Sequence, residues 1–240
     1  MSNVIISKNN IKRLLKDVAT ILKNPLSAQG IYYTHDESDM YKGYAMIIGP
    51  GDTPYEYGYY FFEFNYSHNY PYEPPKVKYC TNDGVTRFNP NLYRNGKVCV
   101  SILNTWRGEQ WTSCQTISSI LLTLVTLLNE NPLTNEPGFS AGHKSCEPYR
   151  RMIEYQNINV AIIKFLNPEN TPVKFIGFLP IMEKHFQENK DKILDKVNKL
   201  IESDNNNKKE YVSVYNMNVT YNYELVKENL IQLINNKNSK

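Results

Sequence analysis

The sequence predicts a mixed α/β (α+β) domain in which helices flank a four-stranded antiparallel meander, with a mainly helical extension behind it. Three observations predict this class: an amphipathic helical pattern near the N-terminus, four short β-rich runs separated by turn residues, and two apolar helical segments after a long irregular stretch. Short strands with short connections are typical of antiparallel sheets. A chain of 240 residues can also bury a core without disulfides or metals.

The first element is expected to be a helix over residues 8–23, because apolar residues recur there at spacings of three and four. They are Ile11, Leu14, Leu15, Val18, Ile21 and Leu22. Pro25 ends the helix, since its ring and missing N–H disrupt helical hydrogen bonding. The four β-rich runs cover residues 30–34, 41–48, 59–66 and 77–80, with a Gly-Pro-Gly-Asp turn at 49–52.

Two more helices are expected over residues 116–129 and 148–165. The first is apolar nearly all round, which is typical of a buried central helix. Beyond Pro168 the pattern changes to a long amphipathic helix at 179–202, a polar break at 204–209, weak alternation at 211–221 and a last helix at 224–235. We therefore expect a core domain at 1–168 and a mainly helical C-terminal extension at 169–240, whose apolar stripes must be covered by the core or a partner.

Composition and charge exclude several classes of function. Lys and Arg number 27 and Asp and Glu 24, and a net charge of +3 is too small to indicate nucleic-acid binding. No apolar run approaches the roughly 18 residues of a membrane span. Residues 4–6 are the apolar run nearest the N-terminus and are too short for a signal-peptide core. The sequence therefore predicts a cytoplasmic or nuclear protein without membrane or nucleic-acid partners.

The cysteines and histidines are too scattered to indicate a metal site. Cys80, Cys99, Cys114 and Cys146 include no closely spaced pair, and the four histidines are equally dispersed. A disulfide framework is also disfavoured in a reducing compartment. We expect no metal and no cofactor.

Cys99 lies in an irregular stretch, residues 88–111, and its neighbours point to chemistry. A lone cysteine is usually a small buried hydrophobe. This one follows a proline-bearing turn and Gly96-Lys97, where the backbone can approach a ligand and a cation favours the thiolate. Asn91 in that turn offers an amide that can donate to a developing oxyanion. A turn asparagine can equally bond its own backbone.

The residues favour exchange chemistry over hydrolysis at Cys99. A cysteine protease needs a histidine base, and none lies near Cys99 in sequence, although a distant one could approach in space. Thiol–thioester exchange needs no strong base, because its leaving group is itself a thiolate.

Three motifs together resemble the ubiquitin-conjugating enzyme family. They are a Tyr-Pro-x-x-Pro-Pro lead-in at residues 70–75, an Asn89-Pro90-Asn91 turn where the family has His-Pro-Asn, and a cysteine eight positions after Asn91 with Trp111 beyond it. The resemblance covers about residues 10–167 and implies the UBC fold: N-terminal helix, antiparallel meander, active-site loop and C-terminal helices. The long connection at 105–111, the segment 131–138 and the long extension are similar to the subgroup containing conjugating enzyme Z and the inhibitor-of-apoptosis-type conjugating enzymes.

The resemblance implies roles for individual residues. Cys99 matches the nucleophile that forms the thioester, and Asn91 matches the asparagine credited with oxyanion stabilisation or loop ordering. Glu136 stands roughly where the family often has an acidic residue flanking the incoming lysine. A carboxylate there could orient the amine, although an ordinary solvated loop charge would look the same.

The resemblance also implies docking surfaces for a ubiquitin ligase and the activating enzyme. Tyr72, Trp111 and Ser113 match ligase-docking loops. Lys12, Arg13 and Lys16 match a basic helix face used for the ligase and the activating enzyme. Any one of these charges could instead belong to an ordinary solvated helix face.

Two residues depart from the family pattern. Asn89 replaces the histidine, which is thought to brace the loop, and Ser101 replaces an acidic residue common two positions after the cysteine. Asparagine can still hydrogen-bond, so we expect altered loop stability rather than lost chemistry. Less negative charge near Cys99 could favour the thiolate or change lysine preference.

The expected function is that of a ubiquitin-conjugating transferase. Cys99 would accept ubiquitin or a ubiquitin-like modifier from the activating enzyme and pass it to a lysine of a protein substrate, usually with a ligase. The activating enzyme consumes the ATP, so no nucleotide site is expected. The alternative is a catalytically inactive ubiquitin-binding scaffold of the same fold, although such relatives typically lack the cysteine. A cysteine hydrolase is a weaker rival.

Overall fold

The computed structural model describes residues 8–203 and 205–238. The apolar run at 4–6 and the first residue of the predicted polar break therefore lie outside the described residues. Within the described part of the chain, no helix is both long and apolar enough to cross a membrane.

Helix α1 spans Lys8–Lys23, as predicted. Its buried apolar face is formed by Leu14, Val18 and Ile21, which recur at helical spacing and face β1 and α2. Leu15 and Leu22 belong to the predicted apolar pattern, yet each is about half exposed, at 50% and 54%. Each follows a buried residue by one position, which turns its side chain about 100° away from the sheet.

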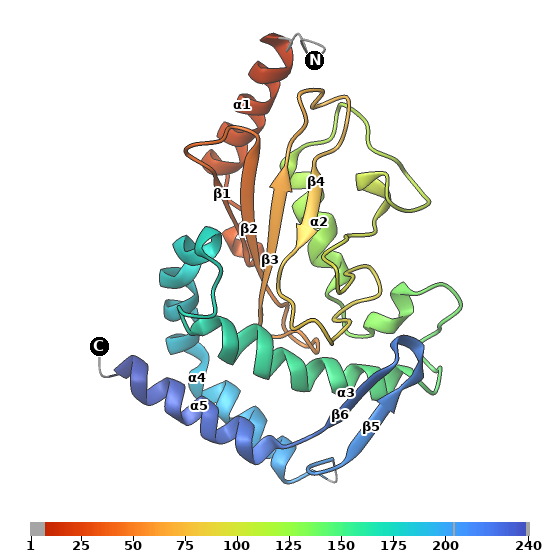
Figure 1. Cartoon of the computed structure of the whole chain (residues 1–240), viewed down its shortest axis with the longest axis vertical. Helices are drawn as coiled ribbons and strands as arrows, with labels where there is room; N and C mark the ends of the chain where they lie inside the picture. The colour runs from red at the N-terminus through yellow and green to blue at the C-terminus, as the bar shows by residue number, and fades with distance from the viewer. Residues whose placement is uncertain (1–7, 204, 239–240) are drawn as a thin grey trace.

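The predicted meander is confirmed as one four-stranded antiparallel sheet in the order β1-β2-β3-β4 (Figure 1). The strands are Ile31–His35, Lys42–Ile48, Tyr59–Asn65 and Lys76–Tyr79. Ala45 of β2 pairs with Phe62 of β3, which in turn pairs with Tyr79 of β4. This register buries the ring of Phe62 between neighbouring strands.

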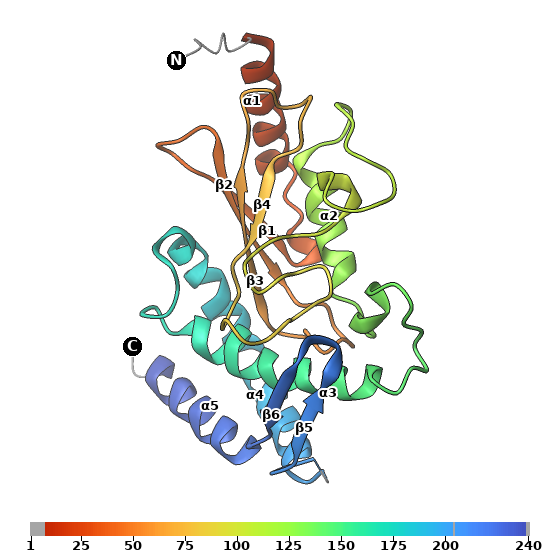
Figure 2. The same ribbon diagram turned by 45° about the vertical axis from the view of Figure 1, so that its right-hand side comes forward.

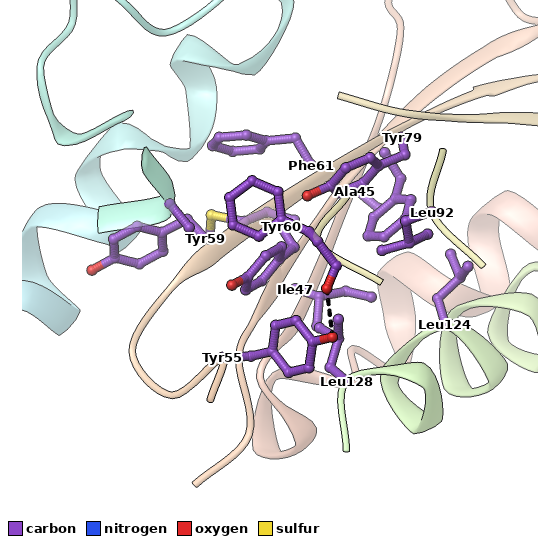
Figure 3. Close-up of a cluster of buried hydrophobic side chains, with 14 of the residues drawn as sticks. Ala45, Ile47, Tyr55, Tyr59, Tyr60, Phe61, Tyr79, Leu92, Leu124 and Leu128 are labelled. Atoms are coloured by element: carbon purple, nitrogen blue, oxygen red, sulfur yellow. Dashed lines mark hydrogen bonds between the residues drawn. The ribbon is translucent and has the colours of Figure 1, made fainter. Parts of the chain in front are cut away.

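Tyrosines fill much of the core beside this sheet (Figure 3). Tyr55, Tyr59 and Tyr60 are fully buried, and each hydroxyl has an acceptor. Tyr55 donates to the carbonyl of Phe88 at 2.7 Å, and Tyr59 donates to that of Met182 at 2.9 Å. A buried hydroxyl costs stability unless it is hydrogen-bonded, so these contacts make a tyrosine-rich core tolerable.

The helices after the irregular stretch begin and end differently from the prediction. α2 spans Ile117–Leu127, with Thr116 and Ser119 forming a capping box at its start, so it ends two residues before the predicted Asn129. A short 3-10 helix, Pro132–Asn135, follows. α3 spans Cys146–Gln156, and the chain then continues as a π-helix over Asn157–Lys164.

The side-chain contacts of Asn157 account for the change from α-helix to π-helix. Its buried amide donates to the carbonyl of Glu56 at 2.8 Å and accepts from the hydroxyl of Tyr60 at 2.5 Å. A Cβ at Gly58 would lie 1.9 Å from Asn157 Oδ1, so only glycine allows this approach. Contacts with a distant loop therefore hold the first residue of the π-helix, and the local sequence pattern contains no sign of it.

The extension consists of a 3-10 helix, Val173–Phe178, helix α4, a hairpin and helix α5. α4 spans Leu179–Ile201, β5 spans Lys209–Val212, β6 spans Met217–Thr220 and α5 spans Tyr223–Asn238. Both predicted helices are confirmed, and the weakly alternating stretch is a two-stranded sheet. Helix α3 runs past the lower end of the main sheet, and α4, α5 and the hairpin lie beneath it (Figure 1, Figure 2).

The core covers part of the apolar surface of the extension, although Val173 and Leu225 are among the apolar side chains left exposed. Phe175 stacks on Phe61 of β3 with ring centroids 4.7 Å apart, and Lys174 pairs with Glu63 of the same strand. On α4 the buried residues include Met182 and Phe186. The extension and the core domain thus share one cluster of buried side chains. The boundary between residues 168 and 169 stays a prediction.

Candidate active site

Asn89 is fully buried at the base of the predicted turn. Its Nδ2 donates to the carbonyl of Leu127 at 2.7 Å and to the hydroxyl of Tyr55 at 3.0 Å. Its Oδ1 accepts from the backbone N–H of Asn91 at 2.9 Å and from Nδ2 of Asn135 at 3.4 Å. The residue that replaces the family's histidine thus ties the turn to the end of α2 and to the segment before Glu136.

Asn91 forms hydrogen bonds with both the N–H and the C=O of Cys99. Asn91 Nδ2 donates to the carbonyl of Cys99 at 2.6 Å, and the N–H of Cys99 donates to the carbonyl of Asn91 at 2.9 Å. Asn91 Oδ1 is buried without a partner among the described residues. The side chain of Asn91 therefore orders the loop beside Cys99.

The thiol of Cys99 is sheltered, since the residue is only 3% exposed. Its Sγ donates to the backbone carbonyl of Thr105 at 2.9 Å. The hydroxyl of Thr105 accepts from the N–H of Val100 at 2.9 Å and fixes that carbonyl in place. Among the described residues, no histidine hydrogen-bonds to this thiol. Because a thiolate is the nucleophile, attack requires Sγ to leave Thr105.

The other three cysteines lie in different surroundings. Cys114 is exposed, and Cys146 is buried with Sγ 3.2 Å from the carbonyl of Ser140. Burial raises the pKa of the Cys80 thiol. Cys114 is thus the most accessible of the four thiols, and Cys99 is distinguished by its neighbours rather than by its exposure.

An open pocket of about 820 Å³ is lined mainly by residues of the long connection that follows Cys99. Its lining includes Thr105, which accepts from that thiol, and Pro137, which follows Glu136; the other lining residues are Asn104, Trp106, Arg107 and Gln110. Gln110 Nε2 donates to the carbonyl of Trp106 at 2.8 Å, which closes the long connection upon itself. Cys99 does not line this pocket itself; Thr105 connects the pocket with the thiol.

Glu136 is partly buried beside this pocket and carries a contact that sequence reasoning missed. The hydroxyl of Tyr215, in the C-terminal hairpin, donates to Glu136 Oε2 at 2.6 Å. The two residues stand 79 positions apart, and no motif links them. The sequence therefore contains no signal that could have revealed the pair.

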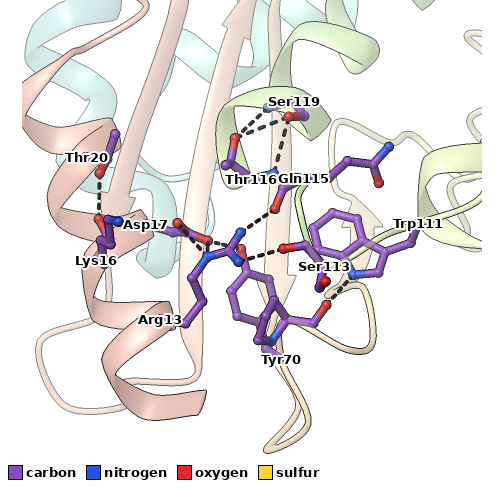
Figure 4. Close-up of polar contacts among 11 residues, drawn as sticks. Arg13, Lys16, Asp17, Thr20, Tyr70, Trp111, Ser113, Gln115, Thr116 and Ser119 are labelled. Carbon is purple, nitrogen blue, oxygen red and sulfur yellow. Dashed lines mark hydrogen bonds and ion pairs between the residues drawn. The ribbon is translucent and has the colours of Figure 1, made fainter. Parts of the chain in front are cut away.

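Arg13 and Trp111, both predicted to dock partners, are occupied within the molecule (Figure 4). The guanidinium of Arg13 donates to the carbonyls of Ser113 at 2.6 Å and Gln115 at 2.8 Å, and it pairs with Asp17 at 2.9 Å. Trp111 Nε1 donates to the carbonyl of Pro71 at 2.6 Å, and its ring is buried. These two side chains join α1, the proline-rich loop and the segment before α2.

The remaining predicted docking residues are exposed around that junction. Tyr72 is 74% exposed and follows Pro71, and Ser113 is exposed next to the carbonyl that Arg13 binds. Lys12 and Lys16 are exposed on α1. The structure thus gathers the six predicted docking residues in one region. Arg13 and Trp111 hold its segments together, and the other four residues face solvent.

The fold and these motifs define the class of protein. The model of the family described as ubiquitin-conjugating enzyme matches residues 13–170, more than half of the sequence. The chain belongs to the ubiquitin-conjugating enzyme family, a family of transferases, and its core has the UBC fold.

Individual relatives support the same subgroup that the sequence suggested. Ubiquitin-conjugating enzyme E2 Z of Xenopus tropicalis is 43% identical over 163 residues, which make up 67% of this chain and 51% of that protein. The human E2 Z is 42% identical over 180 residues, 73% of this chain and 49% of that protein. Human BIRC6, named a dual E2 ubiquitin-conjugating enzyme/E3 ubiquitin-protein ligase, is 37% identical over 186 residues, 73% of this chain and 4% of that protein.

The predicted similarity to the Z and inhibitor-of-apoptosis-type subgroup is confirmed by these relatives. The chain spans about half the length of the E2 Z proteins that it matches. Among solved structures, human ubiquitin-conjugating enzyme E2 G1 matches 50% of this chain and 94% of its own, at 31% identity and a TM-score of 0.43.

Proposed function

We propose that this protein accepts ubiquitin or a ubiquitin-like modifier as a thioester on Cys99 and transfers it to a lysine of a protein substrate. In the first step the Cys99 thiolate attacks the thioester carbonyl on the activating enzyme, and the activating enzyme's cysteine leaves as a thiolate. In the second step the lysine amine attacks the new thioester, which forms an isopeptide and releases Cys99.

The geometry around Cys99 is the observation that carries this proposal. Asn91 bonds to the N–H and the C=O of Cys99, and Thr105, which accepts from the sheltered thiol, lines an open pocket. A fixed backbone with one labile contact at Sγ suits a nucleophile that alternates between thiol and acyl carrier. A cysteine that only fills space in the core would not need its backbone held in this way.

The absence of a histidine partner on the thiol, within the described residues, is compatible with this reaction. Both sides of the first step have sulfur leaving groups of similar basicity, so no strong general base is required. Lysine attack is harder, because an oxyanion develops as the amine adds. We assign Asn91 Nδ2 as the donor to that oxyanion and Glu136 as the acidic group that orients the amine.

The partners follow from the same proposal. The activating enzyme and a ligase would dock on the region formed by α1 and the loops at 70–75 and 111–115. Within it, Lys12, Lys16, Tyr72 and Ser113 offer exposed contacts, while Arg13 and Trp111 keep the region in shape.

A charging experiment tests the proposal. The full chain is incubated with activating enzyme, ATP and ubiquitin, and separately with ubiquitin-like modifiers, and then run on a non-reducing gel. We expect an adduct that reductant cleaves, and Cys99→Ser should give a reductant-resistant oxyester, because serine is a weaker acyl acceptor but still one. Single changes to serine at Cys80, Cys114 and Cys146 are the matched controls and should leave the adduct.

Two outcomes would contradict the assignment. Loss of the adduct in Cys114→Ser, with charging retained in Cys99→Ser as a reductant-sensitive adduct, would move the nucleophile to Cys114. No adduct with any modifier, combined with measurable binding of free ubiquitin, would favour the inactive scaffold.

A further inference from the structure

The turn of the C-terminal hairpin lies against the loops that carry the candidate active site (Figure 1, Figure 2). This turn is the 3-10 segment Ser213–Tyr215 between β5 and β6. Its last residue, Tyr215, donates its hydroxyl to Glu136 Oε2 at 2.6 Å. A residue of the extension thus touches the acidic side chain assigned above to the incoming lysine.

Two arginines from the run that carries the active-site turn anchor Tyr215. Arg94 Nη2 donates to the backbone carbonyl of Tyr215 at 2.6 Å. The guanidinium of Arg87 lies 5.1 Å from the centre of the Tyr215 ring, within the range of a cation–π contact. The N–H of Arg87 also contacts Sδ of Met217, two residues further along the hairpin, at 3.1 Å. Backbone and ring are both held, so the direction of the hydroxyl is set by the fold.

The residues before and after Glu136 in the sequence contact or border the loops around Cys99. The preceding residue, Asn135, donates through Nδ2 to Asn89 Oδ1 at 3.4 Å and to the carbonyl of Leu127 at 3.0 Å. The following residue, Pro137, lines the pocket together with Thr105, whose carbonyl accepts from the Cys99 thiol. Glu136 thus stands between a residue bonded to the Asn89 turn and a residue that lines the pocket.

Tyr215 is the hydrogen-bond donor of the pair. Burial and the hydrogen bond to Glu136 raise the pKa of the Tyr215 phenol, so the hydroxyl stays protonated and donates at neutral pH. Among the described residues, none donates to the other oxygen, Oε1.

We propose that Tyr215 is a positioning residue for transfer to lysine: it fixes the Glu136 carboxylate through Oε2 and leaves Oε1 to receive the incoming ammonium group. This inference rests on the proposed function. The hairpin would then be part of the acceptor side of the active site, and the extension would influence which acceptors react. It has no part in the first step, where no amine is involved.

The reaction that this arrangement serves is balanced by two protons. The lysine ammonium loses one proton to become a nucleophilic amine, and the amine nitrogen loses another after it has bonded to the thioester carbonyl carbon. As the C–S bond breaks, Cys99 leaves as a thiolate. One proton returns the thiolate to the thiol and the other passes to water, so no other reactant is needed.

The test uses the full chain, purified as its ubiquitin thioester, and single-turnover discharge into free lysine at several lysine concentrations. Tyr215→Phe removes only the hydroxyl. Tyr211→Phe is the matched control, because its exposed hydroxyl donates to Asn216 Oδ1 at 3.2 Å in the same hairpin. Charging with activating enzyme and a melting curve are recorded for each variant.

We expect Tyr215→Phe to charge normally and to discharge about tenfold more slowly at low lysine, as when a hydrogen bond to a charged group is lost. The variant should need a higher lysine concentration to reach half of its maximal discharge rate, while the rate at saturating lysine should change little. In a Glu136→Ala background the same change should have no further effect, since the hydroxyl acts only through the carboxylate. Tyr211→Phe should behave as the wild type.

Failure of this inference and failure of the proposed function would look different. Normal discharge by Tyr215→Phe, or an equal slowing by Tyr215→Phe with and without Glu136, would overturn the positioning role while charging persists. A melting temperature that falls together with the charging rate would also overturn it and would assign Tyr215 to structure. If the wild-type chain formed no thioester at all, the proposed function would fall first and the inference with it.

Discussion

The backbone N–H of Asn91 donates to the side-chain oxygen of Asn89 at 2.9 Å. This bond explains how the turn keeps its shape although the family's histidine is missing. The amide of Asn89 reaches the same turn with Oδ1 while Nδ2 binds the carbonyl of Leu127 on the opposite side. A short side chain with one donor and one acceptor end is therefore sufficient to brace the loop.

Removal of that brace should destabilise the protein. Asn89→Ala leaves the N–H of Asn91 without its acceptor in a buried setting, which costs about 1–3 kcal/mol. For a chain of this size we expect the melting temperature to fall by about 2–4 °C for each kcal/mol. Differential scanning calorimetry measures the fall, and the charging gel should show slower thioester formation.

The control for this change is Asn95→Ala in the same loop. Asn95 is exposed, and its Oδ1 accepts from the N–H of Lys97 at 3.0 Å, so one asparagine contact is lost there without leaving a buried group unpaired. An Asn89→Ala melting temperature equal to that of Asn95→Ala would show that the buried network does not brace the turn.

Asn91 should matter to stability and to transfer at once. Its Nδ2 donates to the carbonyl of Cys99, so Asn91→Ala removes one hydrogen bond worth about 1 kcal/mol and should lower the melting temperature. The same amide is the donor proposed for the oxyanion of lysine attack, and one such donor is typically worth about 10²–10³ in rate. We expect Asn91→Ala to charge Cys99 but to discharge slowly into lysine.

The two roles of Asn91 are separated by measuring discharge and melting on the same preparation. Lower stability with wild-type discharge would confine Asn91 to the loop. Slow discharge with an unchanged melting temperature would instead argue against the bracing role. Unchanged discharge and unchanged stability would remove Asn91 from both.

Local patterns predicted the fold well where one face of an element decides its structure. The helix at Lys8–Lys23 follows from the spacing of Leu14, Val18 and Ile21, and the strands follow from short β-rich runs between turns. The change to a π-helix at Asn157 was missed, because it depends on how closely that amide approaches Gly58 across the fold. The nearby sequence has no pattern that encodes such an approach.

At the candidate site, too, local sequence patterns indicated some residues and missed those that depend on distant contacts. Cys99 and Asn91 were singled out because the turn and the cysteine stand at a fixed short spacing, and the structure places the two in contact; their catalytic roles stay predictions. The structural role of Arg13 could not be predicted from the sequence. Its acceptors are backbone carbonyls about a hundred positions away, and any residue type supplies a backbone carbonyl. The contact of Tyr215 with Glu136 was missed for a related reason: it forms only after the hairpin has folded back onto the core.

The reactivity of the cysteines offers a direct check on the resting state of the site. The Cys99 thiol donates to Thr105 and is almost fully covered, whereas Cys114 is exposed. Because alkylation requires an accessible thiolate, iodoacetamide should modify Cys114 before Cys99 in the native, uncharged protein. Peptide mass spectrometry over a time course gives both rates.

Thr105→Gly serves as the companion variant in this experiment. It removes the hydroxyl that accepts from Val100 and holds the Thr105 carbonyl near the thiol, so modification of Cys99 should become faster while that of Cys114 stays the same. Faster modification of Cys99 than of Cys114 in the wild type would contradict the sheltered thiol seen here.

Docking of α4 on the sheet should depend on pH through His185. This imidazole lies 3.1 Å from the hydroxyl of Tyr59, which also donates to the carbonyl of Met182. Burial lowers the pKa of His185 below its ordinary value of 6.5, and the nearby charge of Glu188 opposes the shift only in part. The folded state thus resists protonation of this ring more than the unfolded chain does.

The sign of the effect follows from proton linkage. Above about pH 6.5 the ring is neutral in both states and the stability is fully present. As the pH falls below that value the unfolded chain takes up the proton first, so the free energy of unfolding decreases, by at most about 1.4 kcal/mol per pH unit for one group. The loss continues until the pH has passed through the lowered pKa of the folded state.

His185→Asn should therefore reduce the fall in melting temperature between about pH 7.5 and pH 5.5. His35, whose pKa burial also lowers, contributes a fall of the same sign in both proteins, so the difference between them isolates His185. His68→Asn removes an exposed imidazole and is the matched control, with the wild-type pH dependence expected. Calorimetry in buffers of equal ionic strength measures all three. Parallel curves for wild type and His185→Asn would show that α4 docks without sensing this titration.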